Sequence, residues 1–125
     1  MALRAEMLVF GCREDDLAVL RSASKPNGPI LLTVGSAAEL AEHSIRRRPV
    51  AVILGVAAGT PDHLDLIPVL RASRDDLRVI VIAEDDSLDL ERSARQKSIF
   101  YYLVHPIDRF EVEAVLKDVL RCAEG

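Results

Sequence analysis

The chain has 125 residues and a mass of 13.8 kDa, which predicts one domain over residues 1–125. Half of the residues are hydrophobic and the mean hydropathy is +0.16, so the chain can build a core and disorder is not expected. A net charge of −4 argues against direct binding of nucleic acid. The cysteines Cys12 and Cys122 lie far apart and are expected to be free thiols in a reducing compartment, which favours the cytoplasm.

Neither a secretory signal nor a membrane span is expected. Residues 1–6 lack a long apolar region followed by a cleavage site. The longest apolar runs, such as Val50–Val56, are far shorter than the ~20 residues that cross a bilayer. These features predict a soluble protein without membrane partners.

Five short apolar runs are spread along the chain, and each is rich in Val, Ile, Leu and aromatic residues. The runs are nearly continuous rather than alternating, a pattern typical of strands that are buried on both faces in a parallel sheet. In chain order they are Met7–Phe10, Ile30–Val34, Val50–Val56, Val79–Ala83 and Ile99–Val104.

Helical segments with start signals lie between these runs. Asp15 and Asp16 place negative charge at the start of the first helix. Ser36 and Glu39 form a capping box at the start of the second. The run Arg46–Arg48 suits the C-terminal end of that helix, with an anion-binding patch as the alternative.

The third and fourth helices are less regular. Pro68 would cost ~3 kcal/mol inside a helix, so the third helix is expected to start late, with Asp65 as its cap and Pro68 in its first turn. The fourth helix, over 87–97, is capped by Asp86 or Ser87. Because it carries few apolar residues, it should pack shallowly and be more mobile than the others.

The last helix begins with a second capping box, formed by Asp108 and Glu111. Five strands that alternate with five helices predict a three-layer α/β sandwich. Its five-stranded parallel sheet is expected in the flavodoxin-like order 2-1-3-4-5, with a functional crevice at the carboxyl ends of the strands.

Three stretches at these strand ends resemble receiver domains of two-component response regulators. They are residues 49–56, 78–84 and 102–107, and the third, Tyr-Leu-Val-His-Pro-Ile, is the most specific. The resemblance covers almost the whole chain and implies a single receiver-like domain. It also implies phosphoryl transfer from a histidine kinase to an aspartate after the third strand, aided by an acid pair that holds Mg²⁺, a hydroxyl residue and a lysine.

Carried over to this sequence, those chemical groups are missing. Gly55 holds the phosphoacceptor position, and the acid pair is replaced by Gly11 and Cys12 or, one residue later, by Cys12 and Arg13. The hydroxyl position is Ala83, followed by Glu84, and the lysine position is His105. Only Tyr102, an aromatic that often changes rotamer on activation, is retained. This pattern predicts a degenerate receiver, or pseudo-receiver, without a phosphoacceptor.

The expected function is therefore phosphorylation-independent signalling through protein contacts, in a two-component-type or transcriptional regulatory pathway. No enzymatic activity, cofactor or metal is expected. The partner is another protein, a covalently linked output domain or a second copy of the chain. The resemblance places the docking surface on the fourth helix, fifth strand and fifth helix, with Leu88, Leu90, Arg92, Arg95, Tyr102, Arg109 and Phe110.

The alternative function is binding of a small ligand or cofactor in the crevice. It rests on small residues that would leave the crevice roomier and less polar, namely Gly11, Gly55, Ala57, Ala58 and Ala83.

Single polar residues near the crevice allow two interpretations each. His105 is expected to cap a strand end and bond to the backbone, with a proton-sensitive switch as the alternative. Cys12 is expected to be a plain small residue rather than a redox sensor. Asp62 is expected to be a helix cap rather than a substitute phosphorylation site.

A metal site built from shifted acids is the less favoured interpretation of five carboxylates, because helix starts account for most of them: Glu14, Asp15, Asp16, Asp62 and Glu84. The histidines at positions 43, 63 and 105 are too scattered to indicate zinc.

Overall fold

The computed structural model describes residues 4–24, 27–57 and 59–124. Strands and helices alternate along the chain, and a short 3₁₀ helix, η1, precedes the third α-helix. The elements are β1 (Glu6–Phe10), α1 (Glu14–Ala23), β2 (Ile30–Thr33), α2 (Ala37–Arg47), β3 (Ala51–Val56), η1 (Pro61–Asp65), α3 (Leu66–Ser73), β4 (Arg78–Ala83), α4 (Leu88–Arg95), β5 (Tyr101–Val104) and α5 (Arg109–Glu124).

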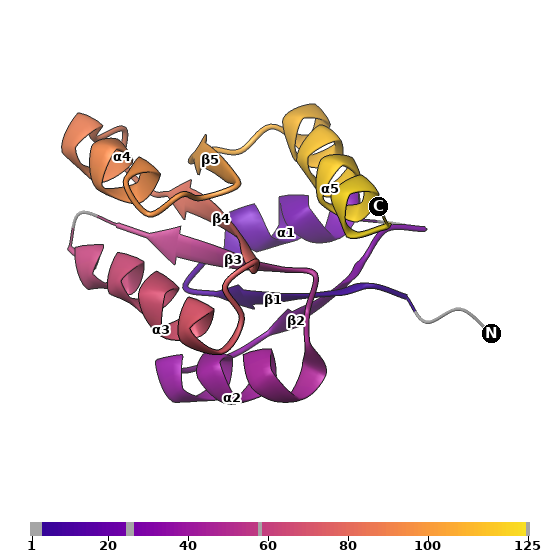
Figure 1. Cartoon of the computed structure of the whole chain (residues 1–125). Coiled ribbons are helices and arrows are strands. Elements are labelled where there is room, and N and C mark those ends of the chain that lie inside the picture. Colours follow the sequence, from indigo (N-terminus) through magenta and orange to yellow (C-terminus); the bar gives the residue numbers. More distant parts are fainter. Residues whose placement is uncertain (1–3, 25–26, 58, 125) are drawn as a thin grey trace.

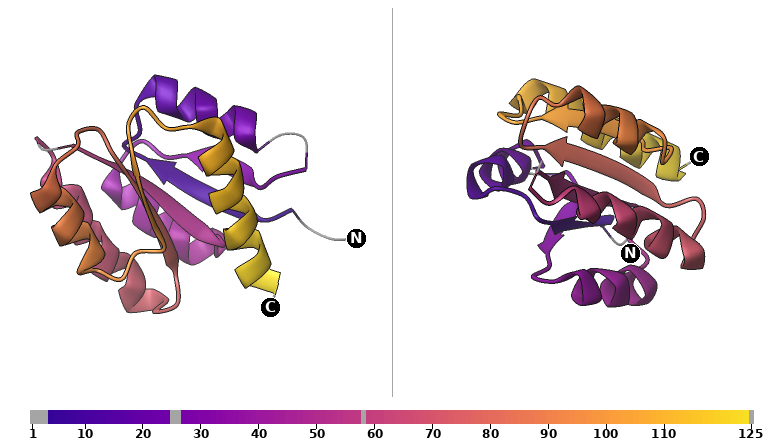
Figure 2. Two further views of the ribbon diagram at one scale, coloured as in Figure 1. Left: turned by 90° about the horizontal axis from the view of Figure 1, so that it is seen from above. Right: turned by 90° about the vertical axis from the view of Figure 1, so that its left-hand side faces the viewer.

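The strands form one parallel sheet in the order β2-β1-β3-β4-β5, which confirms the predicted topology. Helices cover both faces of the sheet, so the molecule has three layers (Figure 1; Figure 2). Buried side chains of α1 and α5 pack on one face, and those of α2, α3 and α4 pack on the other.

The core follows from the apolar runs, with one difference from expectation. Every residue of β3 is buried, and so are five of the six residues of β4. Alternate residues such as Val52 and Ile53 contribute to the two opposite layers of the core. The edge strands β2 and β5 are only partly buried, because each has a neighbour on one side only. Burial on both faces therefore holds for the central strands and is wrong for the edges.

Three of the predicted caps are present. The Oγ of Ser36 accepts from the amide of Glu39 at 3.1 Å. The Oγ of Ser87, rather than Asp86, accepts from the amide of Leu90 at 3.2 Å. Asp108 accepts from the amide of Glu111 at 3.0 Å. These bonds satisfy amides that lack a partner in the first helical turn.

The third helix starts late, as Pro68 requires. The five residues Pro61–Asp65 form η1, and α3 begins at Leu66, so Pro68 lies in its first turn. Asp65 occupies the N-cap position, but its side chain makes no capping hydrogen bond. The predicted cap role of Asp62 is wrong, because Thr60 is the N-cap of η1 and Asp62 lies in the first turn.

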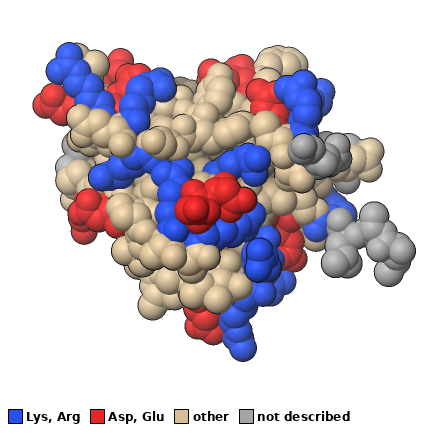
Figure 3. Space-filling view, viewed as in Figure 1, with Lys and Arg blue, Asp and Glu red and all other residues tan. Residues whose placement is uncertain are grey.

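The arginine run lies at the C-terminal end of α2, as predicted. Arg46 pairs with Glu42 at 3.0 Å and Arg47 pairs with Glu6 at 3.1 Å, while Arg48 is the C-cap with a φ of 47°. Figure 3 shows that basic side chains on this face of the molecule lie beside acidic ones. The pairing favours the structural interpretation of the run over an anion-binding patch.

Within the described part of the chain, we find no helix with the length and apolar character that crossing a membrane requires. Ala58, one of the small residues of the predicted crevice, lies outside the described residues.

Candidate functional site

The register of the sheet brings the predicted pocket positions together at one edge. Phe10 pairs with Leu54 at the end of β1, so Gly11 follows directly beside Gly55. In the neighbouring pair of strands, Val56 lies opposite Ala83. His105 follows β5, and its backbone amide donates to the carbonyl oxygen of Ala83 at 2.8 Å. The residues directly after β1 are Gly11 and Cys12, while Arg13 is the N-cap of α1.

Gly55 and Gly11 are in direct backbone contact. A Cβ added to Gly55 would lie 2.3 Å from the carbonyl oxygen of Gly11 and 2.7 Å from the Cα of Cys12. Gly11 has a φ of 80°, a conformation that residues with a side chain rarely adopt. The loop between β1 and α1 therefore fills the space in which a side chain at position 55 would begin.

This contact contradicts the expectation of a roomier crevice at Gly55. The absent side chain is replaced by backbone rather than by open space. A hollow of about 490 Å³ exists elsewhere, between η1 and α4, and none of the predicted pocket residues lines it. The small residues at this edge therefore no longer support binding of a small ligand in the crevice.

His63 packs beside the two glycines. Its Nδ1 donates to the carbonyl oxygen of Gly55 at 3.0 Å, and its ring lies 5.0 Å from the ring of Phe10, centroid to centroid. A Cβ on Gly11 would lie 3.1 Å from the same Nδ1. Sequence reasoning treated His63 only as a scattered histidine, because its distance along the chain from β1 hides this contact.

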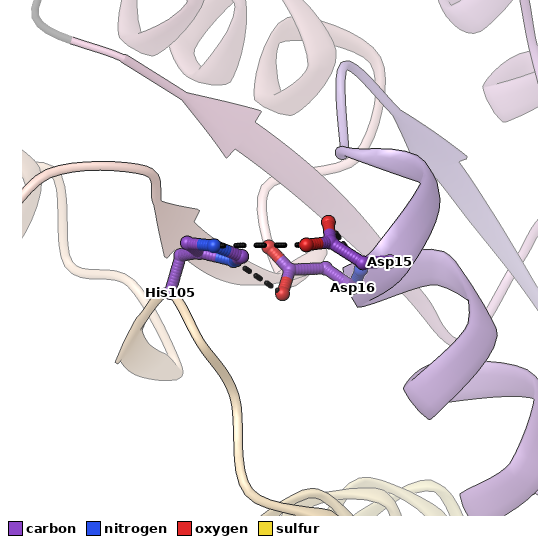
Figure 4. Close-up of side chains that lie close together, drawn as sticks. All are labelled: Asp15, Asp16 and His105. Carbon is purple, nitrogen blue, oxygen red and sulfur yellow. Dashed lines mark hydrogen bonds and ion pairs between the residues drawn. The ribbon is translucent and has the colours of Figure 1, made fainter.

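His105 binds the carboxylates of α1. Its Nδ1 lies 2.7 Å from Oδ1 of Asp16, and its Nε2 lies 3.7 Å from Oδ2 of Asp15. Figure 4 shows both carboxylates pointing toward the imidazole ring. The expected bond from the His105 side chain to the backbone is therefore wrong, since the side chain meets Asp16 instead.

The two aspartates differ in their surroundings. The side chain of Asp16 is 3% exposed, and its Oδ2 has no hydrogen-bond partner. The side chain of Asp15 is 59% exposed, and its Oδ1 lies 3.2 Å from Nε of Arg13. The hydrogen bond from that guanidinium lowers the pKa of the Asp15 carboxyl. Asp15 is therefore a carboxylate at neutral pH.

Sequence analysis placed Asp16 at a helix start and, as the less favoured interpretation, among the acids of a metal site. Asp16 precedes Leu20 by four residues, and this spacing puts both side chains on the buried face of α1. The spacing was a usable signal, because a charged residue on an apolar face needs a partner. The identity of that partner, 89 residues further on, was not readable from the sequence.

Cys12 is a partly buried thiol with a raised pKa rather than a reactive one. Burial, with smaller contributions from the charges of Asp16 and Glu84, raises the pKa of its thiol to about 12. A thiol with this pKa is almost entirely protonated at neutral pH, so the plain small residue is the better interpretation. Cys122 is free and exposed.

Some residues of the predicted docking surface are exposed, as a docking role requires, and one is buried. Leu88 at the start of α4 is 59% exposed, and Phe110 at the start of α5 is 77% exposed. Leu90 is only 5% exposed and belongs to the core, so its assignment to a surface is wrong. The guanidinium of Arg95 lies 5.7 Å from the centroid of the Tyr102 ring.

The three arginines of the predicted surface are exposed. Arg92 and Arg95 lie in the last turn of α4, and Arg95 pairs with Glu91 at 2.8 Å. Arg109 begins α5 and pairs with Glu113 at 3.0 Å. The predicted surface residues therefore include two exposed apolar side chains and three exposed arginines.

Comparison with known proteins adds sequence and fold relationships. No family model matches the chain. The sequence is 31% identical over 110 residues to the DNA-binding transcriptional regulator NtrC of Azospirillum brasilense; this match covers 86% of the chain but 23% of that regulator. The signal receiver domain of an HD domain-containing protein from Pseudomonas fluorescens has a TM-score of 0.81 at 22% identity, with 98% of each chain covered. This is the receiver fold.

A second solved structure, NtrX from Brucella abortus, shares the receiver fold with a TM-score of 0.81 at 18% identity. The match covers 98% of this chain and 28% of that protein. The receiver fold of this chain thus corresponds to part of the length of both NtrC and NtrX. Within this fold, the predicted pocket positions gather at the carboxyl edge of the sheet.

Proposed function

We propose that the chain is a phosphorylation-independent receiver domain, or pseudo-receiver, that signals by docking to another protein. The observation that carries this proposal is the contact between Gly55 and the Gly11 carbonyl. Position 55 has no carboxylate, and the backbone of the neighbouring loop occupies the place where one would begin. Acceptance of a phosphoryl group by an aspartate requires that carboxylate as the nucleophile.

The surrounding positions support the same proposal. Ala83 offers no hydroxyl, and Gly11 and Cys12 offer no oxygen-bearing side chain for Mg²⁺. His105 takes the position expected for a lysine, and its imidazole is engaged by Asp16. All the roles of phosphoryl chemistry are thus vacant together at this edge of the sheet.

Docking is proposed through the surface formed by α4, β5 and α5. Figure 1 shows β5 at the edge of the sheet, with α4 and α5 on its two sides. Leu88 and Phe110 expose apolar surface on α4 and α5, and the same helices carry Arg92, Arg95 and Arg109, of which Arg95 and Arg109 pair with glutamates. A buried apolar centre with a polar rim is a common arrangement in protein interfaces.

The partner is proposed to be a linked output domain or a second copy of the chain. The chain spans 23% of the length of NtrC, which is named as a DNA-binding transcriptional regulator. A role in transcriptional regulation is proposed on this relationship. The domain itself is proposed to act by contact rather than by catalysis.

Self-association with and without a phosphoryl donor tests the proposal. Sedimentation velocity over a concentration series is expected to show the same dimerisation in the presence and absence of acetyl phosphate and Mg²⁺. Dimerisation that appears only with acetyl phosphate would contradict phosphorylation independence. A strictly monomeric chain at the highest soluble concentration would contradict self-association and leave a linked or separate partner as the target.

A further inference from the structure

We propose that Asp15, Asp16 and His105 form a binding site for a divalent transition-metal ion of the Zn²⁺ type. This inference goes beyond the proposed docking function and departs from the sequence expectation that no metal is bound. That expectation treated the acids as helix-start residues and the histidines as scattered. In the folded chain, however, the acids of α1 lie beside His105, which follows β5.

The three side chains are close enough to share one ion. One ligand atom from each lies within 4.8 Å of the others. The direct ligands are Nε2 of His105 and Oδ2 of Asp15, which are 3.7 Å apart. Because bonds from zinc to nitrogen or carboxylate oxygen measure about 2.0–2.2 Å, an ion between these two atoms reaches both with little movement.

Asp16 orients the imidazole for this role. Its Oδ1 lies 2.7 Å from Nδ1 of His105, so Nδ1 carries the proton and Nε2 presents its lone pair toward Asp15. A carboxylate that accepts from the second nitrogen of a metal-binding histidine is a recurrent feature of zinc sites. In Figure 4 both carboxylates lie on the same side of the imidazole, and a dashed line joins each of them to it.

An independent observation is a buried oxygen of Asp16 that has no partner. The side chain of Asp16 is 97% buried, since only 3% is exposed, and its Oδ2 is buried without a hydrogen-bond partner. A buried carboxylate with an unpaired oxygen is costly, and a nearby cation relieves that cost. Arg13 does not fill this role, because its Nε pairs with Oδ1 of the more exposed Asp15.

The chemistry of the donors sets the class of ion. An imidazole together with carboxylates suits zinc and its neighbours, whereas Mg²⁺ favours oxygen ligands alone. The side chains of Asp15 and His105 are 59% and 21% exposed, which leaves a path for the ion and room for water ligands. The ion would link α1 to the segment that leads into α5, so binding should also raise the melting temperature.

Titration with Zn²⁺ alone tests the site. The experiment uses the full chain with Cys122→Ser, which removes the exposed thiol, and isothermal calorimetry with a parallel melting curve. We expect one Zn²⁺ per chain. His105→Gln and Asp15→Asn are expected to abolish measurable binding or to weaken it at least about 10-fold. Asp16→Asn is expected to weaken it about 10–100-fold, as when the carboxylate that bonds a metal-binding histidine is lost.

His43→Gln is the matched control, because His43 lies on α2, outside the cluster, and it should leave the affinity unchanged. Asp15 is exposed, so Asp15→Asn keeps the test valid even where Asp16→Asn fails to fold. Absence of saturable Zn²⁺ binding would overturn the proposal. It would equally be overturned by binding that survives both His105→Gln and Asp15→Asn, or that is lost in His43→Gln, since an adventitious ion only would then be present. None of these outcomes bears on phosphorylation or dimerisation.

Discussion

Gly55 and Gly11 depend on each other, because their backbones approach more closely than any Cβ would permit. The carbonyl oxygen of Gly11 lies where a side chain at position 55 would start, and the φ of 80° at Gly11 favours glycine there. His63 then covers the pair and donates to the carbonyl oxygen of Gly55. The space in which a side chain at position 55 would begin is therefore filled by backbone.

The contact between Gly55 and Gly11 predicts that alanine substitutions at Gly55 and at Gly59 will change the free energy of unfolding by different amounts. Gly55→Ala should destabilise the fold by about 1–3 kcal/mol, because the added methyl overlaps backbone that has to shift. Gly59→Ala is the control, since a Cβ there meets nothing within 4 Å and should change the free energy of unfolding by less than about 1 kcal/mol. Urea unfolding measures both. Equal effects of the two substitutions would contradict the closed pocket.

The raised pKa of the Cys12 thiol predicts that it reacts slowly with thiol reagents. With a pKa raised from 9.0 to about 12, Cys12 should react with a thiol reagent at pH 8 only as the chain unfolds, whereas the exposed Cys122 should react at once. The variants Cys122→Ser and Cys12→Ala separate the two rates. Rapid labelling of Cys12 in the folded chain would contradict this account and reopen a redox role.

The same shift fixes the sign of a pH effect. A thiol with a raised pKa stabilises the fold fully below pH 9, and that contribution is lost as the pH rises from 9 toward 12. The parent should therefore lose more stability above pH 9 than Cys12→Ala does, as measured by urea unfolding at each pH. A parallel decline in the two proteins would contradict burial of the thiol.

At the residue scale, the sequence predicted which residues lie at the strand ends better than it predicted which side chains bond to each other. The end of each strand follows from the apolar runs, so Gly55, Ala83 and His105 could be assigned to one crevice in advance. The bond between His105 and Asp16 could not, since the two residues are 89 positions apart and only the packing of α1 beside the β5 end joins them. The closure of the pocket by Gly11 depended likewise on a backbone conformation that composition does not reveal.

At the scale of elements, α4 divides its apolar residues between the core and solvent. Leu90 and Ala94 are buried and hold the helix on the sheet, while Leu88 is exposed at its start. These two buried residues agree with the shallow packing predicted for α4. The greater mobility of α4 stays a prediction. The residues left at the surface of α4, β5 and α5 are those available to a partner.

This surface predicts a position-specific effect on association. Phe110→Glu places a charge at the centre of the proposed interface, so it should weaken dimerisation at least about 10-fold, the loss expected when a central aromatic contact is removed. Ile45→Glu on α2 is the matched control, because Ile45 is 63% exposed and lies outside the proposed surface. Sedimentation measures both variants. Loss of dimerisation in Ile45→Glu alone would move the interface to α2.

The helix caps could be predicted from the sequence because each cap and its partner are close together along the chain. Ser36, Ser87 and Asp108 each precede their amide partner by three residues, so the sequence contains the whole interaction. The 3₁₀ helix η1 had no such signature. Pro61 and Pro68 indicated an irregular start, but the conformation between them depends on packing against β3.

At the scale of the whole molecule, the alternation of buried runs and amphipathic helices specifies the sheet order. Central strands that are apolar on both faces need helices on both sides, and right-handed crossovers then favour the order β2-β1-β3-β4-β5. The chain has the receiver fold with Gly55, Ala83 and His105 at the ends of β3, β4 and β5. Carboxylates that face one another repel, so their replacement by small residues is compatible with a stable fold.

We propose that this receiver fold has no functional phosphoacceptor. Intact-mass spectrometry after incubation with acetyl phosphate and Mg²⁺ tests it directly, with a receiver domain that carries the full acid set as the positive control. The mass of this chain should stay unchanged under conditions that label the control. An added phosphoryl group that is lost on treatment with hydroxylamine, as an acyl phosphate is, would contradict it.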